Sequence, residues 1–127
     1  MDKEQIRTDF EFLKKDGRVL GVLIFGSRVE GRAHERSDVD ICVVAPGAKP
    51  WDVLKQVYPH LDTEKKGYDV HVFEEFPLHL KHRVMENYEI VWTRDKGKLE
   101  EYFYTYRKLW NDQAKARGVA APAVSAR

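Results

Sequence analysis

The stretch Phe25–Cys42, which reads FGSRVEGRAHERSDVDIC, carries the strongest structural signal in the chain. It joins two apolar segments, Val19–Phe25 and Ile41–Ala45, and such segments are typical of strands inside a helix-covered sheet. Asp38 and Asp40 lie two residues apart at the start of the second strand, so their side chains should point to the same face. Two carboxylates that converge raise each other's pKa unless a cation lies between them. The pattern therefore predicts a site for a divalent metal.

Gly26-Ser27 directly follows the first apolar segment. Glycine permits a tight strand-to-helix turn, and Ser27 would lie where the free N–H groups of a helix N-terminus favour a bound phosphate. The structural alternative is an ordinary glycine-serine turn, with the aspartates acting as a helix N-cap or an edge-strand pair. At this spacing, the turn and the aspartate pair together favour a site for phosphoryl or nucleotidyl transfer.

A third acidic ligand is expected at Asp69, because two-metal transfer usually needs a carboxylate beside the attacking oxygen. Asp69 lies at the start of the expected strand Asp69–Phe73 and on the side of it that faces away from the core. The alternative is that Asp69 merely protects an exposed strand edge. Glu74 and Glu75 are rival ligands, but they lie past the strand. His71 shares the face of Asp69, although a lone histidine is more often structural.

The rest of the pattern alternates helices with strands, which predicts an α/β or α+β fold with a helix-covered sheet. Helices are expected at residues 3–15, 26–33, 51–61, 77–88 and 98–116, and strands at 18–25, 38–45, 68–73 and 89–92. In domain terms, we expect a catalytic domain over residues 1–95, an amphipathic helix over 96–117 that packs on the core or on a partner, and a disordered tail over 118–127.

Composition excludes several classes of protein. The chain has 127 residues, of which 43% are apolar, as in a globular domain. Its formal net charge of +1 gives no general attraction to nucleic acid. Cys42 is the single cysteine, so no internal disulfide can form. The sequence has neither an apolar run of membrane-spanning length nor the apolar core of a signal peptide, so we expect a cytoplasmic location without membrane partners.

Gly26-Ser27, ten intervening residues and then Asp38-Val39-Asp40 resemble the signature of the DNA polymerase beta-type nucleotidyltransferase superfamily. Within it, the short chain is similar to the minimal nucleotidyltransferases, the antitoxin partners of HEPN-domain toxins. The resemblance covers about residues 1–95 and is strongest from Val19 to Val44. It implies the nucleotidyltransferase fold, a small mixed sheet covered by helices, here with an extra C-terminal helix.

Further positions carry the same resemblance. Gly31 and Ser37 fit the family's pattern, and Arg28 follows the glycine-serine pair, where arginine is frequent. Glu30 departs from it, because the family often has arginine immediately before the second glycine. An acidic group there would not help to hold a triphosphate, so Arg28 or Arg32 would do that work, or nucleotide affinity would be reduced.

The resemblance implies a site and an activity. Asp38, Asp40 and Asp69 would be the catalytic residues and would hold two Mg²⁺ ions. The nucleotide, ATP, would be bound by four residues: Gly26, Ser27, Arg28 and Ser37. AMP would pass to a tyrosine near the catalytic site of a HEPN ribonuclease, and the bulky, charged product would neutralise that toxin.

The final helix bears an aromatic stripe that has two interpretations. Its members are Leu99, Tyr102, Phe103, Tyr106, Leu109 and Trp110. Most stripes at this spacing are core, but tyrosine and tryptophan are also enriched in binding hot spots. Larger superfamily members carry an extra domain for the acceptor, so here the acceptor is expected on a partner.

Two other functions stay open. The chain could be a catalytically inactive antitoxin that masks its partner sterically, with Glu30 as a sign of decay. Retention of the three aspartates and of the glycine-serine pair argues against that alternative. Transfer to a small molecule or to RNA is the other possibility, and the near-neutral charge disfavours RNA.

Overall fold

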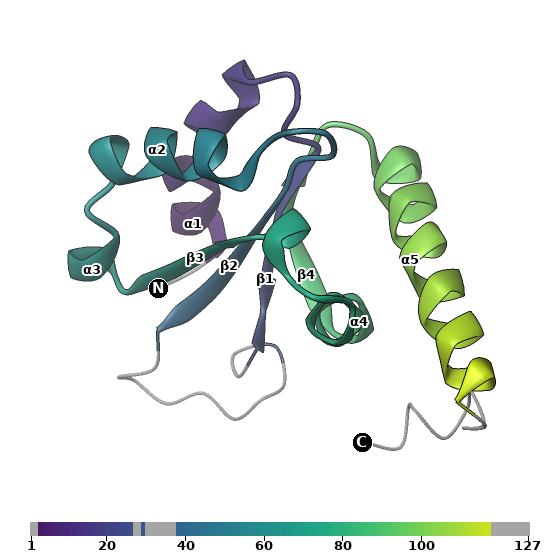
Figure 1. The fold of residues 1–127 in the computed structure, drawn as a ribbon. Helices are drawn as coiled ribbons and strands as arrows, with labels where there is room; N and C mark the ends of the chain where they lie inside the picture. The colour runs from purple at the N-terminus through teal and green to yellow at the C-terminus, as the bar shows by residue number, and fades with distance from the viewer. Residues whose placement is uncertain (1–2, 27–28, 30–37, 118–127) are drawn as a thin grey trace.

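The structure, a computed structural model, describes residues 3–26, 29 and 38–117 (Figure 1). The described strands form a mixed sheet in the order β3-β2-β1-β4. Their bounds are β1 Gly21–Phe25, β2 Val39–Val44, β3 Tyr68–Val72 and β4 Tyr88–Thr93. Strand β1 is antiparallel to both β2 and β4, whereas β2 and β3 are parallel. The predicted fold class, a small mixed sheet with helical cover, is confirmed.

Helices cover both faces of this sheet (Figure 1). Their bounds are α1 Lys3–Asp9, η1 Glu11–Lys15, α2 Pro50–His60, α3 Thr63–Lys66, η3 Phe73–Glu75, α4 Leu78–Glu86 and α5 Lys96–Ala116. Helices α1 and α2 lie on one face, and α4 and α5 lie on the other. Among these described helices, none combines the length and hydropathy needed to cross a bilayer.

Each face of the sheet has its own core, because alternate side chains of a strand point to opposite faces. Ile41 and Val43 of β2 pack toward α1 and α2, in the larger of the two apolar clusters. Cys42 and Val44 pack toward α4 and α5, together with buried residues such as Phe103. Asp40 belongs to this second set by alternation, so it lies at the end of the face that α4 and α5 cover.

Several boundaries differ from the sequence prediction for local reasons. The predicted helix over residues 3–15 changes to a 3-10 helix after Phe10, which still buries both Phe10 and Leu13. Helix α3 was not predicted. It is short, and it is ended by Gly67, whose φ of 76° is the left-handed region that glycine favours. The predicted helix over 26–33 lies almost wholly outside the described residues.

The C-terminal helix begins two residues earlier than predicted. The side chain of Asp95 accepts a hydrogen bond from the backbone N–H of Lys98 at 3.1 Å and so caps the first turn of α5. Leu99 and Phe103 are fully buried against the sheet, whereas Tyr104 and Leu109 are 64% and 43% exposed. The helix therefore has one face committed to the core and one face in solvent.

Candidate active site

Gly26 forms the turn at the end of β1 and lies directly against the side chain of Asp40. Its φ is 82°, and a Cβ at this position would lie 2.3 Å from Oδ2 and 3.1 Å from Cγ of Asp40. Phe25, the preceding residue, pairs with Asp40 across β1 and β2. Glycine is therefore required here both by the backbone conformation and by the closeness of the Asp40 side chain.

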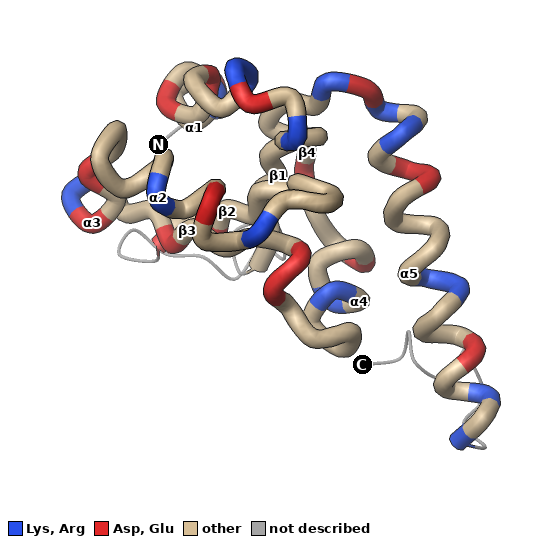
Figure 2. Tube along the Cα trace, turned by 45° about the horizontal axis from the view of Figure 1, so that its top comes forward, with Lys and Arg blue, Asp and Glu red and all other residues tan. Residues whose placement is uncertain are grey.

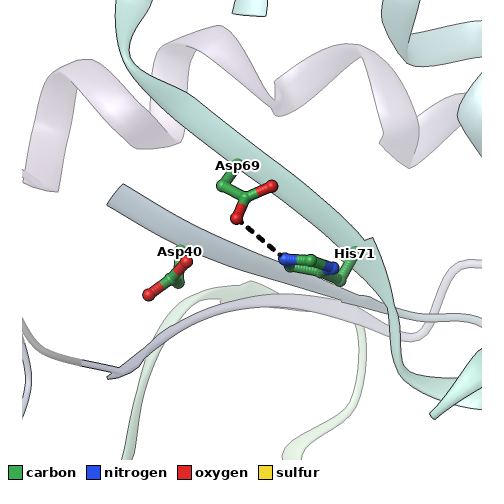
Figure 3. Close-up of side chains that lie close together, drawn as sticks. All are labelled: Asp40, Asp69 and His71. Carbon is green, nitrogen blue, oxygen red and sulfur yellow. Dashed lines mark ion pairs between the residues drawn. The ribbon is translucent and has the colours of Figure 1, made fainter. Parts of the chain in front are cut away.

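Asp40 and Asp69 occupy matching positions on neighbouring parallel strands. They are register partners in the β2–β3 pair. Their side chains extend from the same side of the sheet together with His71, as Figure 3 shows. One ligand atom from each of these three residues lies within 4.8 Å of the others. The sheet thus brings together two of the three aspartates singled out from the sequence.

Of the other predicted site residues, only Asp38 and Gly26 are described by the structure. Asp38 is exposed at the residue before β2, and it is not part of this three-residue group. Its charge still acts on Asp40. The predicted nucleotide-binding residues Ser27, Arg28 and Ser37 lie outside the described residues, and Gly26 alone of that set is described.

His71 is held by packing and by one polar contact. Its Nε2 lies 3.1 Å from Oδ2 of Asp69 (Figure 3). Its ring centre lies 5.9 Å from that of Phe25 and 5.3 Å from that of Phe76. Sequence reasoning gave this histidine less weight than the aspartates. The signal that could have singled it out is the two-residue spacing from Asp69, which places both side chains on one face.

Negative charge is in excess around Asp40, because the carboxylates of Asp69 and Asp38 lie close to it. Burial raises the pKa of Asp40, and the carboxylates of Asp69 and Asp38 raise it further, while His71 acts in the opposite direction. A cation would reverse the effect of this repulsion. Carboxylate oxygens are also the ligands that Mg²⁺ prefers. The donor set of Asp40 and Asp69 therefore fits a divalent metal ion.

The two rival carboxylates have structural partners instead. Glu74 accepts a hydrogen bond from the backbone N–H of Ala45 at 3.0 Å and another from the hydroxyl of Tyr102 at 2.7 Å. Glu75 accepts one from the backbone N–H of Val72 at 3.3 Å. Neither belongs to the group at Asp40, so the structure separates them from the candidate site.

A hollow of about 540 Å³ lies at the other end of the strands, between the start of β1 and the start of α5. Its basic residues include Arg18 and Arg94. The guanidinium of Arg94 donates to the carbonyl oxygens of Val19, Lys14 and Asp16 at 3.0 to 3.1 Å, and Arg18 is paired with Asp16. These cations hold the fold together and are not arranged around a ligand, so the carboxylate group is the better candidate site.

Charge over the rest of the molecule is mixed. Figure 2 shows basic and acidic residues interspersed along the traced helices and loops. Such mixing gives little long-range steering of a highly charged ligand. Recognition at the site therefore depends on local contacts.

Comparison with known proteins identifies the family and the fold. The family model described as "Polymerase beta, Nucleotidyltransferase" matches residues 9–97. A protein of Methanocaldococcus jannaschii, named as a candidate protein adenylyltransferase, is 33% identical over 99 residues. That alignment covers 77% of this chain and 75% of the relative. The length matched by the family model includes the described strands β1 to β4.

Solved structures with the same fold are more distant in sequence. One is a toxin–antitoxin complex with AMP-PNP, with a TM-score of 0.67, 18% identity, and coverage of 93% of this chain and 94% of that one. Another is a tri-AMPylated HEPN toxin of Shewanella oneidensis in complex with an MNT antitoxin, with a TM-score of 0.64, 15% identity, and coverage of 92% and 93%. At these identities the likeness establishes the fold.

Proposed function

This chain belongs to the polymerase beta nucleotidyltransferase family, and we propose that it transfers AMP from ATP to a hydroxyl group of a partner protein, with Mg²⁺ as cofactor. The acceptor in this proposal is a tyrosine of a HEPN-domain ribonuclease toxin, which the chain neutralises as its antitoxin. The observation that carries the proposal is the pairing of Asp40 with Asp69 beside the Gly26 turn.

The relatives support the nature of the acceptor. The Methanocaldococcus jannaschii relative is named as a candidate protein adenylyltransferase. Two solved structures with the same fold are toxin–antitoxin complexes, one with AMP-PNP and one with a tri-AMPylated toxin. A protein acceptor is therefore favoured over a small molecule or RNA.

The residues of the site have separate tasks. Asp40 and Asp69, joined by the exposed Asp38, would hold two Mg²⁺ ions, which when bound supply positive charge opposite the phosphates. Asp69, the more exposed of the paired carboxylates, accepts the proton of the acceptor hydroxyl. The acceptor oxygen forms a bond to the α-phosphorus, the bond to the bridging oxygen breaks, and pyrophosphate leaves with that electron pair.

The remaining predicted residues would bind the nucleotide. Ser27, Arg28 and Ser37 flank the described site in sequence, and in this proposal they hold the triphosphate. Residues 1–95 would form the transferase domain. Helix α5 would add its buried face to the core and present its exposed face, with Tyr104 and Leu109, to solvent or a partner.

The test is transfer of label from ATP labelled in its α-phosphate to a HEPN-domain protein encoded beside this chain, followed by intact-mass measurement of that protein. We expect the mass to increase by whole AMP units when Mg²⁺ is added and to stay unchanged when divalent ions are removed with a chelator. Asp40→Asn should lower the transfer rate about 10³-fold or more, which corresponds to about 4 kcal/mol of lost transition-state stabilisation. Asp112→Asn, the same change at an exposed position of α5, should leave the rate unchanged.

The fold should survive the Asp40→Asn change. The raised pKa of Asp40, caused first by burial, means that the folded state penalises the ionised carboxylate, and the amide removes that penalty. Full activity of Asp40→Asn with Mg²⁺ would show the metal assignment to be wrong. Neutralisation of the toxin without any gain in its mass would instead establish steric masking by an inactive antitoxin.

A further inference from the structure

His71 lies with Asp40 and Asp69 in the candidate site, but the proposed mechanism assigns it no role. We propose that its Nε2 is a ligand of the metal bound at Asp40 and Asp69, and that the site therefore prefers Mn²⁺ over Mg²⁺. This inference rests on the metal site of the proposed function and adds the identity of the preferred ion. It is carried by the position of the ring, by what holds the ring there, and by the chemistry of its nitrogen.

The spacing of the donor atoms suits one ion. Nε2 of His71 lies 3.1 Å from Oδ2 of Asp69, and one ligand atom from each of Asp40, Asp69 and His71 lies within 4.8 Å of the other two. Two adjacent ligands of an octahedral ion, each bound at about 2.1 Å, lie about 3 Å apart. The histidine and the aspartate thus already have the separation of neighbouring ligands.

The ring of His71 is oriented by aromatic neighbours. Phe25, at the end of β1, and Phe76, just after η3, contact it with ring centres 5.9 and 5.3 Å away. The backbone carbonyl of Phe76 in turn accepts a hydrogen bond from the buried ammonium of Lys81. A ligand whose orientation is fixed by packing binds a metal with little loss of side-chain entropy.

A nitrogen donor changes which ion binds best. Mg²⁺ prefers oxygen ligands and gives up its water reluctantly, whereas divalent transition metals accept imidazole readily. Mn²⁺ is the member of that series that also favours carboxylate oxygen. Two carboxylates and one imidazole therefore match Mn²⁺ better than they match Mg²⁺.

The experiment measures metal binding by the full chain, without nucleotide or partner. Mn²⁺ alone is titrated while the bound ion is followed by electron paramagnetic resonance, and Mg²⁺ is then added as a competitor. We expect Mn²⁺ to bind about tenfold more tightly than Mg²⁺ or better, and pulsed spectra to show coupling to an imidazole nitrogen. Asp40→Asn should weaken the binding of both ions.

The decisive variant is His71→Phe, which keeps a ring between Phe25 and Phe76 but removes the donor. Mn²⁺ affinity should fall about tenfold or more and the nitrogen coupling should vanish, while Mg²⁺ affinity should change less than about threefold. His71→Gln, which offers an amide oxygen instead, should also lose the coupling and serves if the phenylalanine variant does not fold. His79→Phe is the matched control at an exposed position of α4 and should change neither affinity.

Two results would overturn the inference. Mn²⁺ bound without nitrogen coupling, or equal losses of Mn²⁺ and Mg²⁺ affinity in His71→Phe, would show that the histidine only orients Asp69. Because the measurement needs no acceptor, it is independent of AMP transfer. If AMP is transferred with Mg²⁺ but bound Mn²⁺ shows no nitrogen coupling, this inference is refuted and the proposed function stands. If nitrogen coupling is seen but no AMP is transferred, the metal ligand is supported and the proposed function is refuted.

Discussion

Acidic side chains at the two ends of the sheet have different neighbours, and the pKa values of Asp40 and Asp16 shift in opposite directions. At the end marked by Gly26, Asp40 and Asp69 lie side by side, and the pKa of Asp40 is raised by burial and by its acidic neighbours. At the other end, Asp16 accepts hydrogen bonds from Arg18 and Gln56, and the Arg18 guanidinium holds the pKa of Asp16 well below its ordinary value.

Glu74 extends this comparison to a partly buried carboxylate near the second end. Burial raises its pKa, as at Asp40, but Tyr102 and the backbone N–H of Ala45 donate hydrogen bonds to it and partly offset that effect. Asp16 and Glu74 each accept hydrogen bonds from donors of their own, whereas Asp40 at the Gly26 end lies beside the carboxylates of Asp69 and Asp38. The difference indicates that the second end was built for stability and the first for binding a cation, at a cost in stability without one.

The largest effect is expected from Gly26→Ala at the end of the sheet that holds Asp40 and Asp69, with Gly47→Ala as the control. Both glycines have a φ of 82°, but a Cβ at Gly47 would meet nothing within 4 Å, while at Gly26 it would meet Asp40. Each variant should lose about 1–2 kcal/mol of unfolding free energy from the backbone conformation. Gly26→Ala should in addition lower AMP transfer about 10²-fold, because displacement of a catalytic group by about 1 Å has that effect.

Thermal unfolding and the transfer assay on the same samples separate these contributions. Gly47→Ala should keep its transfer rate once measured well below its melting temperature. Equal AMP transfer by the two variants would mean that Asp40 tolerates displacement. The inference that the Gly26 end of the sheet serves catalysis would then be wrong.

Much of this site could be predicted from the sequence because the relevant signals are local. The two-residue alternation placed Asp69 away from the core and Val70 and Val72 in it, and the structure shows that burial. Gly26 was predicted to form a tight turn, and the structure adds that the Asp40 side chain lies where a Cβ at this position would be. Local spacing carries this information without knowledge of the topology.

What could not be predicted depends on contacts between distant segments. The β2–β3 register sets Asp40 beside Asp69, and no sequence pattern reports register between segments joined by a helix. The structural role of Glu74 depends on Tyr102, which lies 28 residues away. The role of Phe25 and Phe76 around His71 is likewise a product of tertiary packing.

A smaller effect is expected at the stable end from Tyr102→Phe. The change removes the hydroxyl that donates to Oε2 of Glu74 at 2.7 Å and should lower the unfolding free energy by about 1–3 kcal/mol at pH 7. Tyr104→Phe, the same change at a 64% exposed position of α5, should stay within about 0.5 kcal/mol of the parent. Chemical denaturation of both variants measures the difference.

The pH dependence of the Tyr102→Phe effect has a definite sign. The pKa of Glu74 is raised in the folded state, so ionisation of this group destabilises the fold as pH rises above its ordinary value of 4.5. Loss of the Tyr102 donor raises that pKa further and enlarges the penalty. The deficit of Tyr102→Phe should therefore shrink as pH falls from 7 toward 4.5, through the raised folded-state pKa, and a deficit that grew on acidification would contradict the assignment.

The smallest effect is expected from Asp16→Asn, because Arg18 lies in water, which weakens the pair. The folded-state pKa of Asp16 is lowered, first by the Arg18 hydrogen bonds, so its stabilisation is present at pH 7 and is lost as pH falls below its ordinary value of 3.8. The denaturation midpoint of Asp16→Asn should lie below that of the parent at pH 7, and the gap should narrow progressively as pH falls below 3.8, with AMP transfer unchanged. A matching loss of transfer would show that the two ends of the sheet are coupled, and the division between a stabilising end and a binding end would then be wrong.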